Sequence, residues 1–322
     1  MPPSLRAGIA LVVVAALIAA LALLATGAGS SPRPAPPAVT GPPAPNPCSR
    51  PPVPGSTPLS VASGGLVRAA VLHLPPGRKP HVRMPLVVAV HGAGGSGRKM
   101  EPYSGFSKLA DSAGFAVVYP SAVSPHPRWN IYENPAGPDD VAFIRDLLTR
   151  VENVACIDRR SVYAAGVSNG GGMAALLACQ LSDKIAAVAA VAGAYADLPD
   201  CHPPRPVSLL EIHGTADTSV PYGGRSGEDT DADSVLSFVQ SWIERDGCPG
   251  EGATQAMTPD AIRYSWGPCA AGTAVQHIKI LGGTHAWPGA TPPDPGPPTT
   301  VNAAREAWAF FQGRHPALIG GP

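Results

Sequence analysis

A serine between glycines is the first feature of the chain that suggests chemistry. Gly166, Ser168 and Gly170 form a Gly-x-Ser-x-Gly motif, which is weak evidence by itself. A strand-like run, 161–166, precedes the motif, and a helix-like run, 170–181, follows it. A serine on a sharp turn between a strand and a helix has its hydroxyl raised clear of the sheet, so Ser168 is predicted to be a nucleophile.

A serine hydroxyl needs a neighbouring base, and the base needs an acid that orients it. When the nucleophile lies on such a turn, the acid and then the histidine follow it in the chain, each just past a strand. Asp217 stands four residues beyond the apolar run 207–213 and is the predicted acid. Four rival aspartates do not follow a strand so directly: Asp197, Asp200, Asp229 and Asp231.

The chain has nine histidines, and their order removes most of them as candidates for the base. Six precede Asp217, and His315 lies in the C-terminal tail. His277 falls inside the last strand pattern, where a core or surface position is expected. His285 follows that strand on a Gly-rich loop, which is where catalytic groups usually stand, so His285 is the predicted base.

Attack on a carbonyl places negative charge on oxygen, and backbone N–H groups stabilise that charge. The amide of Asn169, next after the serine, is one predicted donor. The second is expected in the loop 91–96, from Ala93 or alternatively from Gly94. No Gly-Lys-Ser/Thr follows these glycines, so the loop is not a phosphate-binding P-loop.

Strand-like and helix-like runs alternate along the chain, which predicts an α/β fold. Further strands are expected at 66–74, 86–91, 115–120, 187–191 and 274–281, and a strand and turn at 261–268. Further helices are expected after Asp139 or Asp140, from Ser234, and near 301–312. Only about 26 residues separate the 187–191 strand from Asp217, and 218–233 is short and polar. That spacing leaves little room for a large cap domain.

Composition and charge limit the partners. The chain has 23 basic and 23 acidic residues, so it lacks the overall field expected of a nucleic-acid binder or a binder of anionic membranes. Residues 7–25 carry no charge and are followed by small residues, which predicts a signal peptide at 1–28 or, alternatively, a membrane anchor. A Pro-rich linker is expected at 29–57, a catalytic domain at 58–314 and a tail at 315–322.

Six cysteines in an exported chain are expected to be paired. Cys248 and Cys269 flank the predicted strand and turn at 261–268 and are the best single pair. Cys48, Cys156, Cys179 and Cys201 allow three pairings, among which the sequence does not choose. No Cys-x-x-Cys spacing occurs, so no zinc site is predicted.

Together these residues resemble a family of secreted esterases, the polyhydroxybutyrate depolymerases grouped with feruloyl and acetyl xylan esterases. The resemblance spans about residues 62–313. It rests on His91-Gly92-Ala93-Gly94-Gly95, Trp129-Asn130, Gly166-Val167-Ser168-Asn169-Gly170-Gly171, His213-Gly214-Thr215-Ala216-Asp217 with Val220-Pro221-Tyr222, and His285-Ala286-Trp287-Pro288-Gly289. It implies an α/β-hydrolase fold: a mostly parallel central sheet with helices on both faces.

The same resemblance implies a Ser168, Asp217, His285 triad, no metal and no organic cofactor. Two positions depart from the family pattern: Thr284 replaces a glycine often found before the histidine, and Ala93 stands where a cysteine is common. Neither departure removes a catalytic side chain. They bear instead on the shape of the pocket and on one disulfide.

The sequence thus predicts a secreted serine esterase with a small or polymer-linked ester as its substrate. Trp129 and Trp287 are candidates for substrate contact, because an indole stacks on an aromatic acyl group or a sugar face; the alternative is a place in the core. Acetyl, feruloyl and hydroxyalkanoate esters remain open. Two other functions are a serine peptidase on the same fold and a silent, wall-associated binding protein.

Overall fold

The computed structural model describes residues 46–49, 51–123, 125–132, 134–195, 201–225 and 234–315, all within one compact unit, Pro45–Pro322. The predicted leader (1–28), residues 29–45 of the predicted linker and residues 316–322 of the predicted tail lie outside these ranges. The four rival aspartates lie outside them as well. In the described part of the chain, no helix is long and apolar enough to cross a membrane.

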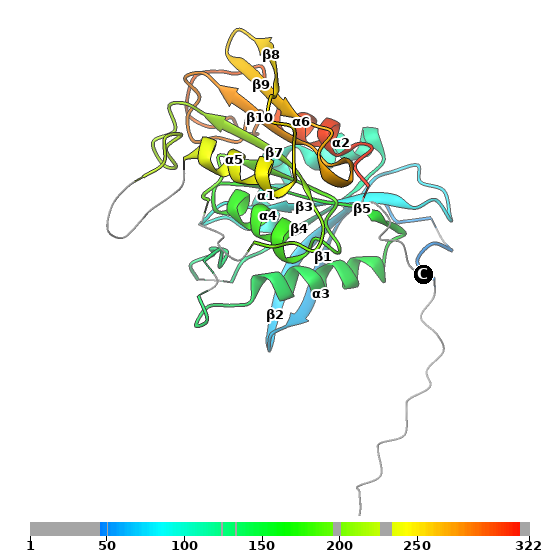
Figure 1. Cartoon of the computed structure of the whole chain (residues 1–322). Coiled ribbons are helices and arrows are strands. Elements are labelled where there is room, and N and C mark those ends of the chain that lie inside the picture. Colours follow the sequence, from blue (N-terminus) through cyan, green and yellow to red (C-terminus); the bar gives the residue numbers. More distant parts are fainter. Residues whose placement is uncertain are drawn as a thin grey trace, which may run out of the picture. The chain divides into compact units, whose positions relative to one another are not determined.

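The described strands form one sheet, in the order β1-β2-β4-β3-β5-β6-β7-β10-β9-β8 (Figure 1). They are β1 (Gly55–Ser63), β2 (Leu66–Leu74), β3 (Met84–Val90), β4 (Ala116–Pro120), β5 (Ile157–Val167), β6 (Ala187–Val191), β7 (Ser208–Gly214), β8 (Ala253–Thr258), β9 (Ala261–Trp266) and β10 (Val275–Ile280). The six central strands from β4 to β10 run parallel. Antiparallel pairs extend both edges, β1 with β2 and β9 with β8.

Burial of both faces explains the composition of the central strands. Every residue of β6 (AVAAV) and β4 (AVVYP) is buried, as expected for parallel strands covered by helices on both sides. The edge strand β8 (ATQAMT) is mostly exposed and correspondingly polar. Hydrophobic runs therefore mark the central strands and not the edges.

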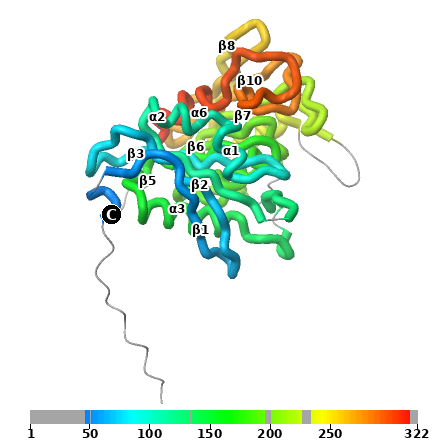
Figure 2. Tube along the Cα trace, turned by 180° about the vertical axis from the view of Figure 1, so that it is seen from behind, coloured from blue at the N-terminus to red at the C-terminus, as the bar shows by residue number. Residues whose placement is uncertain are grey.

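Helices cover both faces of the sheet. They are α1 (Gly97–Ser104), α2 (Phe106–Ala113), α3 (Asp140–Glu152), α4 (Asn169–Gln180), α5 (Val235–Arg245) and α6 (Ala303–Phe311), with a short 3₁₀ turn at Ala270–Gly272. Helices α3, α4 and α5 pack on one face, as Figure 1 shows. Helices α1, α2 and α6 cover the other face, seen from behind in Figure 2. This is the predicted α/β arrangement.

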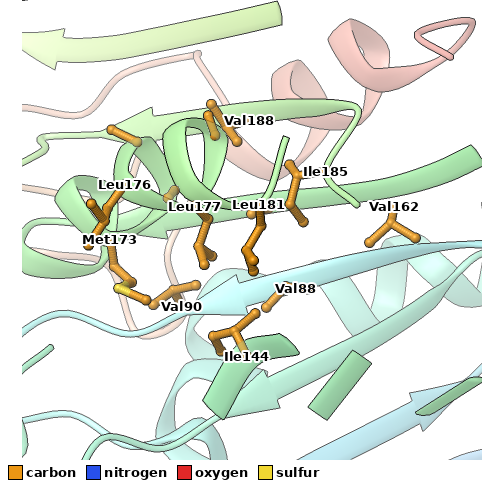
Figure 3. Packing of buried hydrophobic residues seen from close by; sticks show 14 of the residues in the cluster. Val88, Val90, Ile144, Val162, Met173, Leu176, Leu177, Leu181, Ile185 and Val188 are labelled. Atoms are coloured by element: carbon orange, nitrogen blue, oxygen red, sulfur yellow. The ribbon is translucent and has the colours of Figure 1, made fainter. Parts of the chain in front are cut away.

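Helix α4 is the most deeply buried helix next to the site. Its residues from Asn169 to Cys179 are all buried. Figure 3 shows Met173, Leu176 and Leu177 of α4 packed with Val90 of β3 and Ile144 of α3. Because apolar contacts surround it, α4 fixes the position of the serine that precedes it.

The structure pairs Cys248 with Cys269, the pair that the sequence predicted. The other two bonds are Cys48–Cys156 and Cys179–Cys201. Cys48 lies in the predicted linker, and its bond ties residues 46–49 to the residue that precedes β5.

Two described strands, β1 and β8, and two described α-helices, α1 and α2, were not expected from the sequence. Strand β1 begins at Gly55, inside the predicted linker, because its whole length pairs with β2 from Gly55 opposite Leu74 to Ser63 opposite Leu66. Helix α1 contains Pro102, which weakens its helical pattern. Among the described residues no helix lies between β6 and β7 or between β7 and α5.

Candidate active site

Four parallel strands bring the predicted site residues to one edge of the sheet. Strands β3, β5, β7 and β10 all run in the same direction and are followed by Gly92–Gly95, Ser168, Asp217 and His285 respectively. Strand β4 lies on one side of β3, while β5 lies on its other side. Ligands of open α/β sheets bind at such a change of direction, outside the carboxyl ends of the strands.

Ser168 occupies a strained turn between β5 and α4. Its backbone has φ 57° and ψ −125°, a conformation that only glycine adopts without strain. The turn is tight because a Cβ on Gly166 would lie 2.0 Å from the carbonyl oxygen of Gly170. A Cβ on Gly170 would lie 2.4 Å from the carbonyl oxygen of Val90. The two glycines of the motif are therefore required by the close approach of strand and helix.

Asp217 and His285 are in direct contact. Nδ1 of His285 lies 2.8 Å from Oδ2 of Asp217, and the imidazole is 26% exposed while the carboxylate is fully buried. The amides of Ser219 and Val220 each donate to Oδ1 of Asp217 at 2.8 Å. The second oxygen is thus directed at the imidazole by bonds to the first.

The surroundings of Asp217 keep it ionised. Burial raises the pKa of its carboxyl group, but hydrogen bonds from His213, His285 and the Val220 amide outweigh burial and hold the pKa well below the usual range. With Asp217 charged, Nδ1 of His285 carries the proton of the hydrogen bond between them. Nε2 of His285 is then the nitrogen that is free to accept a proton.

Ser168 and His285 line one cavity of about 520 Å³ together with Ala93. The remaining lining residues are mostly apolar or glycine, with one cation and one carboxylate: His91, Gly92, Gly95, Lys99, Met100, Pro102, Tyr103, Val167, Thr291, Pro292 and Asp294. A cavity of this size accepts an organic molecule of moderate size. The structure therefore brings the predicted nucleophile and base to the wall of a single pocket.

The loop after β3 contains two candidate oxyanion donors, which differ in their contacts. The N–H of Gly94, the alternative donor, is bonded to the carbonyl oxygen of Pro127 at 2.8 Å, and the N–H of Gly95 is bonded to that of Gly92. Ala93 lines the cavity. Asn169 begins α4, where the first N–H groups have no partner within the helix. Ala93 and Asn169 thus remain the candidates for an oxyanion hole.

Trp129 and Trp287 are both 1% exposed, and neither belongs to the described residues that line the cavity. The indole N–H of Trp129 donates to the carbonyl oxygen of His91 at 2.8 Å. That of Trp287 donates to the carbonyl oxygen of Ser104 at 3.1 Å. Both tryptophans are therefore packed in the interior and bonded to the backbone of neighbouring segments. This is the core position that was the alternative to substrate contact.

Sequence reasoning missed a buried polar group behind Asp217. Glu211, His213 and His277 are each at most 1% exposed and lie in β7 and β10. His277 was expected in a strand, and its register opposite Glu211 places it in the core. The order of the motifs excluded His213 as the base but gave no sign of its contacts. In the described part of the chain, no group of His, Cys, Asp and Glu is placed to hold a metal ion.

Comparison with known proteins gives the family. Residues 68–201 match the family model described as Esterase PHB depolymerase. NocK of Nocardia uniformis subsp. tsuyamanensis, provisionally named an esterase, is 34% identical over 86% of this chain and 89% of its own. Feruloyl esterase B of Piromyces equi is 31% identical over 68% of this chain, a match that spans only 42% of that longer protein.

A solved structure agrees on the fold. The acetyl xylan esterase from Aspergillus awamori superposes with a TM-score of 0.58 at 17% identity, over 79% of this chain and 98% of that one. The NocK match extends over most of both chains and agrees with the match to the family model. This chain is a carboxylic ester hydrolase with the α/β-hydrolase fold, and it belongs to the PHB depolymerase family of esterases.

Proposed function

We propose that the chain is an exported serine esterase that works through an acyl-enzyme. One arrangement carries the proposal. Ser168, on a strained turn, lines the same cavity as His285, and Nδ1 of His285 lies 2.8 Å from the buried carboxylate of Asp217. In this proposal Ser168 attacks the ester carbonyl and His285 takes its proton. Asp217 fixes the tautomer of His285 and stabilises the imidazolium that forms.

The tetrahedral intermediate carries its negative charge on the former carbonyl oxygen. The N–H groups of Ala93 and Asn169 are the proposed donors to that oxygen, and the N-terminal end of α4 adds a favourable field. His285 then gives its proton to the departing alkoxide, which leaves as the alcohol. Water, deprotonated by the same imidazole, attacks the acyl-serine bond and releases the acid.

The cavity and the relatives support a small or aromatic acyl group. Met100, Pro102 and Tyr103 supply apolar walls, while Lys99 and Asp294 supply charge. The relatives carry the names feruloyl esterase and acetyl xylan esterase. We therefore propose acetyl, feruloyl or short hydroxyalkanoate esters as substrates, free or attached to a polymer.

Export is proposed from the apolar leader at 1–28 and from the three disulfides, which persist in oxidising compartments. The alternative is an uncleaved leader that anchors the enzyme facing outward. The mass of the protein recovered from culture medium separates the two. A chain that begins near residue 29 supports cleavage, and a full-length chain found only with membranes contradicts it.

The test of function compares the purified chain with Ser168→Ala. Ser112→Ala on the exposed face of α2 serves as the matched control. We expect hydrolysis of nitrophenyl acetate by the parent and the control, and its loss in Ser168→Ala. A panel of methyl ferulate, acetylated xylo-oligomers and hydroxybutyrate oligomers then ranks the substrates.

Two outcomes would contradict the proposal. Cleavage of peptide anilides in preference to every ester indicates a serine peptidase. A parent protein that neither cleaves activated esters nor reacts with a fluorophosphonate indicates a silent binding protein on this fold.

A further inference from the structure

A cluster of polar side chains, buried except for the half-buried Tyr222, surrounds Asp217, and none of its members lines the cavity. We call it the His213 cluster. Its members are Tyr195, Glu211, His213, Asp217, Tyr222 and His277. Glu211 and His213 are two positions apart on β7, so their side chains lie on the same face of the sheet. His277 lies opposite Glu211 on β10. The side chains of Glu211 and His213 are fully buried.

Among the described residues, the polar atoms in contact with the ring nitrogens of His213 are all hydrogen-bond acceptors. Its Nδ1 lies 2.9 Å from Oε1 of Glu211. Its Nε2 lies 2.9 Å from the carbonyl oxygen of Val220 and 3.2 Å from Oδ2 of Asp217. An ionised carboxylate and a carbonyl oxygen accept but do not donate, so each ring nitrogen must carry a proton to make these contacts. The geometry therefore requires an imidazolium.

His91 shows the contrast within the same fold. Its Nδ1 lies 2.7 Å from the carbonyl oxygen of Gly92, while its Nε2 accepts from the amide of Ala122 at 3.1 Å. One nitrogen donates and the other accepts, which is the pattern of a neutral ring. Burial accordingly lowers the pKa of His91.

The rest of the cluster supplies donors to Glu211 and no second cation. Tyr195 donates to Oε1 of Glu211 at 2.7 Å, and Nδ1 of His277 lies 2.5 Å from Oε2 of Glu211. The hydroxyl of Tyr222 lies 2.7 Å from Nε2 of His277, so a neutral His277 satisfies both of its contacts. Burial raises the pKa of Tyr195 and of Tyr222, which keeps both hydroxyls protonated.

The charges of the cluster follow from these contacts. Two carboxylates, Glu211 and Asp217, flank one cation, His213, so a single net negative charge remains behind His285. Two further cations lie near the cluster: the ammonium of Lys279 is 5.4 Å from the centre of the Tyr222 ring, and the guanidinium of Arg225 donates to the carbonyl oxygens of Thr218 and Ser219. An isolated buried carboxylate at position 211 would be strongly destabilising, whereas one paired with an imidazolium is tolerated.

We propose that His213 is a permanently charged positioning residue that holds the Asp217 carboxylate against His285. Oδ2 of Asp217 is shared between Nδ1 of His285 and Nε2 of His213, while two backbone amides hold Oδ1. The positive charge of His213 also partly neutralises the Asp217 carboxylate. Asp217 therefore stabilises the protonated form of His285 less than an unpaired carboxylate would. The inference rests on the proposed function, since it assigns the partner of the proposed acid.

Two supporting pKa directions agree with the geometry. Burial lowers the pKa of His213, but the hydrogen bonds that its ring donates to Asp217 and Glu211 outweigh burial and raise the pKa to about 10. Burial likewise raises the pKa of Glu211, but the contacts of its carboxylate with His277 and His213 outweigh burial and lower the pKa. Across the neutral range the pair is therefore charged on both sides.

The direct test is nitrogen NMR of the full chain labelled with ¹⁵N-histidine, with His213→Gln used to assign the resonance. We expect both ring nitrogens of His213 to stay in the protonated range from about pH 5.5 to 8.5, where an ordinary histidine titrates near 6.5. Neutral His91 is the internal control. A His213 resonance that titrates near pH 6.5 would overturn the proposal.

Kinetics test the positioning role. His213→Gln should lower kcat for nitrophenyl acetate by roughly 10- to 100-fold, the cost of a small misplacement in an active site. KM should change by less than about twofold, because the substrate does not touch this residue. The acid limb of the kcat/KM profile should move to higher pH. His277→Gln is the matched control, since it removes a neighbour of Glu211 without touching Asp217.

The other possible outcomes also test the positioning role of His213. Equal effects of the two substitutions on kcat and on the acid limb would mean a purely structural role and would overturn the proposal. If His213→Gln does not fold, the double variant Glu211→Gln/His213→Gln removes both charges and serves for the kinetics. Failure of the parent protein to react with a fluorophosphonate would reject the proposed function, but it would leave the NMR result on His213 to stand by itself.

Discussion

The side-chain amide of Asn169 forms hydrogen bonds with both the backbone N–H and the backbone carbonyl of Trp129. Its Oδ1 accepts from the amide of Trp129 at 2.7 Å, and its Nδ2 donates to the carbonyl oxygen of Trp129 at 3.1 Å. The indole of Trp129 in turn donates to the carbonyl oxygen of His91. One tryptophan therefore joins the two segments that carry the proposed oxyanion donors, Asn169 and the loop after His91.

Removal of the indole N–H should loosen this connection. We expect Trp129→Phe to lower kcat by about 10-fold or more, because a displaced oxyanion donor is costly to the transition state, and to leave KM nearly unchanged. The matched control is Trp242→Phe. Trp242 is fully buried, and its N–H has no hydrogen-bond partner among the described residues. Equal kinetic losses in the two variants would show that Trp129 acts only through packing.

The central part of the fold could be predicted from the sequence for a physical reason. Strands β2 and β6 have the predicted bounds, because a run of apolar residues that ends in turn residues has few alternatives. Strands β1 and β8 were missed because edge strands keep polar, exposed residues. Their position depends on pairing with a neighbour, which a local pattern does not show.

The residues of the site also fall into two groups, those that the sequence predicted and those that it did not. Chain order and strand ends were enough to predict Ser168, Asp217 and His285 as its members, and the structure brings Asp217 and His285 into contact. The partners of Asp217 depend instead on tertiary register. His277 stands opposite Glu211 only because β10 pairs with β7, although 66 positions separate the two residues. No spacing rule predicts such a pair.

The tight turn at Ser168 gives a prediction for stability. A methyl group on Gly170 would meet the carbonyl oxygens of Val90 and His91, at 2.4 and 2.5 Å. We expect Gly170→Ala to destabilise the fold by about 1–3 kcal/mol or more, through overpacking. Gly223→Ala is the control, because an added Cβ there meets nothing within 4 Å. Urea unfolding measures both, and an unchanged midpoint for Gly170→Ala would contradict this account of the turn.

Stability should also depend on pH through His213. Its folded pKa of about 10 is above the ordinary value of 6.5, so its contribution is complete below about pH 6.5 and is lost as the pH rises toward 10. The difference in unfolding free energy between the parent and His213→Gln should therefore shrink between pH 6.5 and pH 10. Urea unfolding at several pH values measures it. A difference that grows with pH would have the wrong sign for a buried imidazolium.

The Cys179–Cys201 bond links the end of α4, the helix that follows Ser168, to the chain before β7. It closes a loop with a sequence separation of 22, so replacing both cysteines by alanine should cost about 3 kcal/mol. Replacing Cys248 and Cys269, with a separation of 21, should cost a similar amount. Esterase activity below the melting temperature should survive both changes. Inactivity of a folded Cys179→Ala/Cys201→Ala variant would show that the bond shapes the site.

The most direct measurement of the central claim is the mass of the trapped enzyme. The purified chain is mixed with a fluorophosphonate or with excess nitrophenyl acetate, quenched in acid and mapped by peptide mass spectrometry. A covalent adduct on the peptide that contains Ser168, absent from Ser168→Ala, is the expected result. A chain that hydrolyses the ester while Ser168 stays unmodified, or that carries the adduct on another residue, would contradict the account.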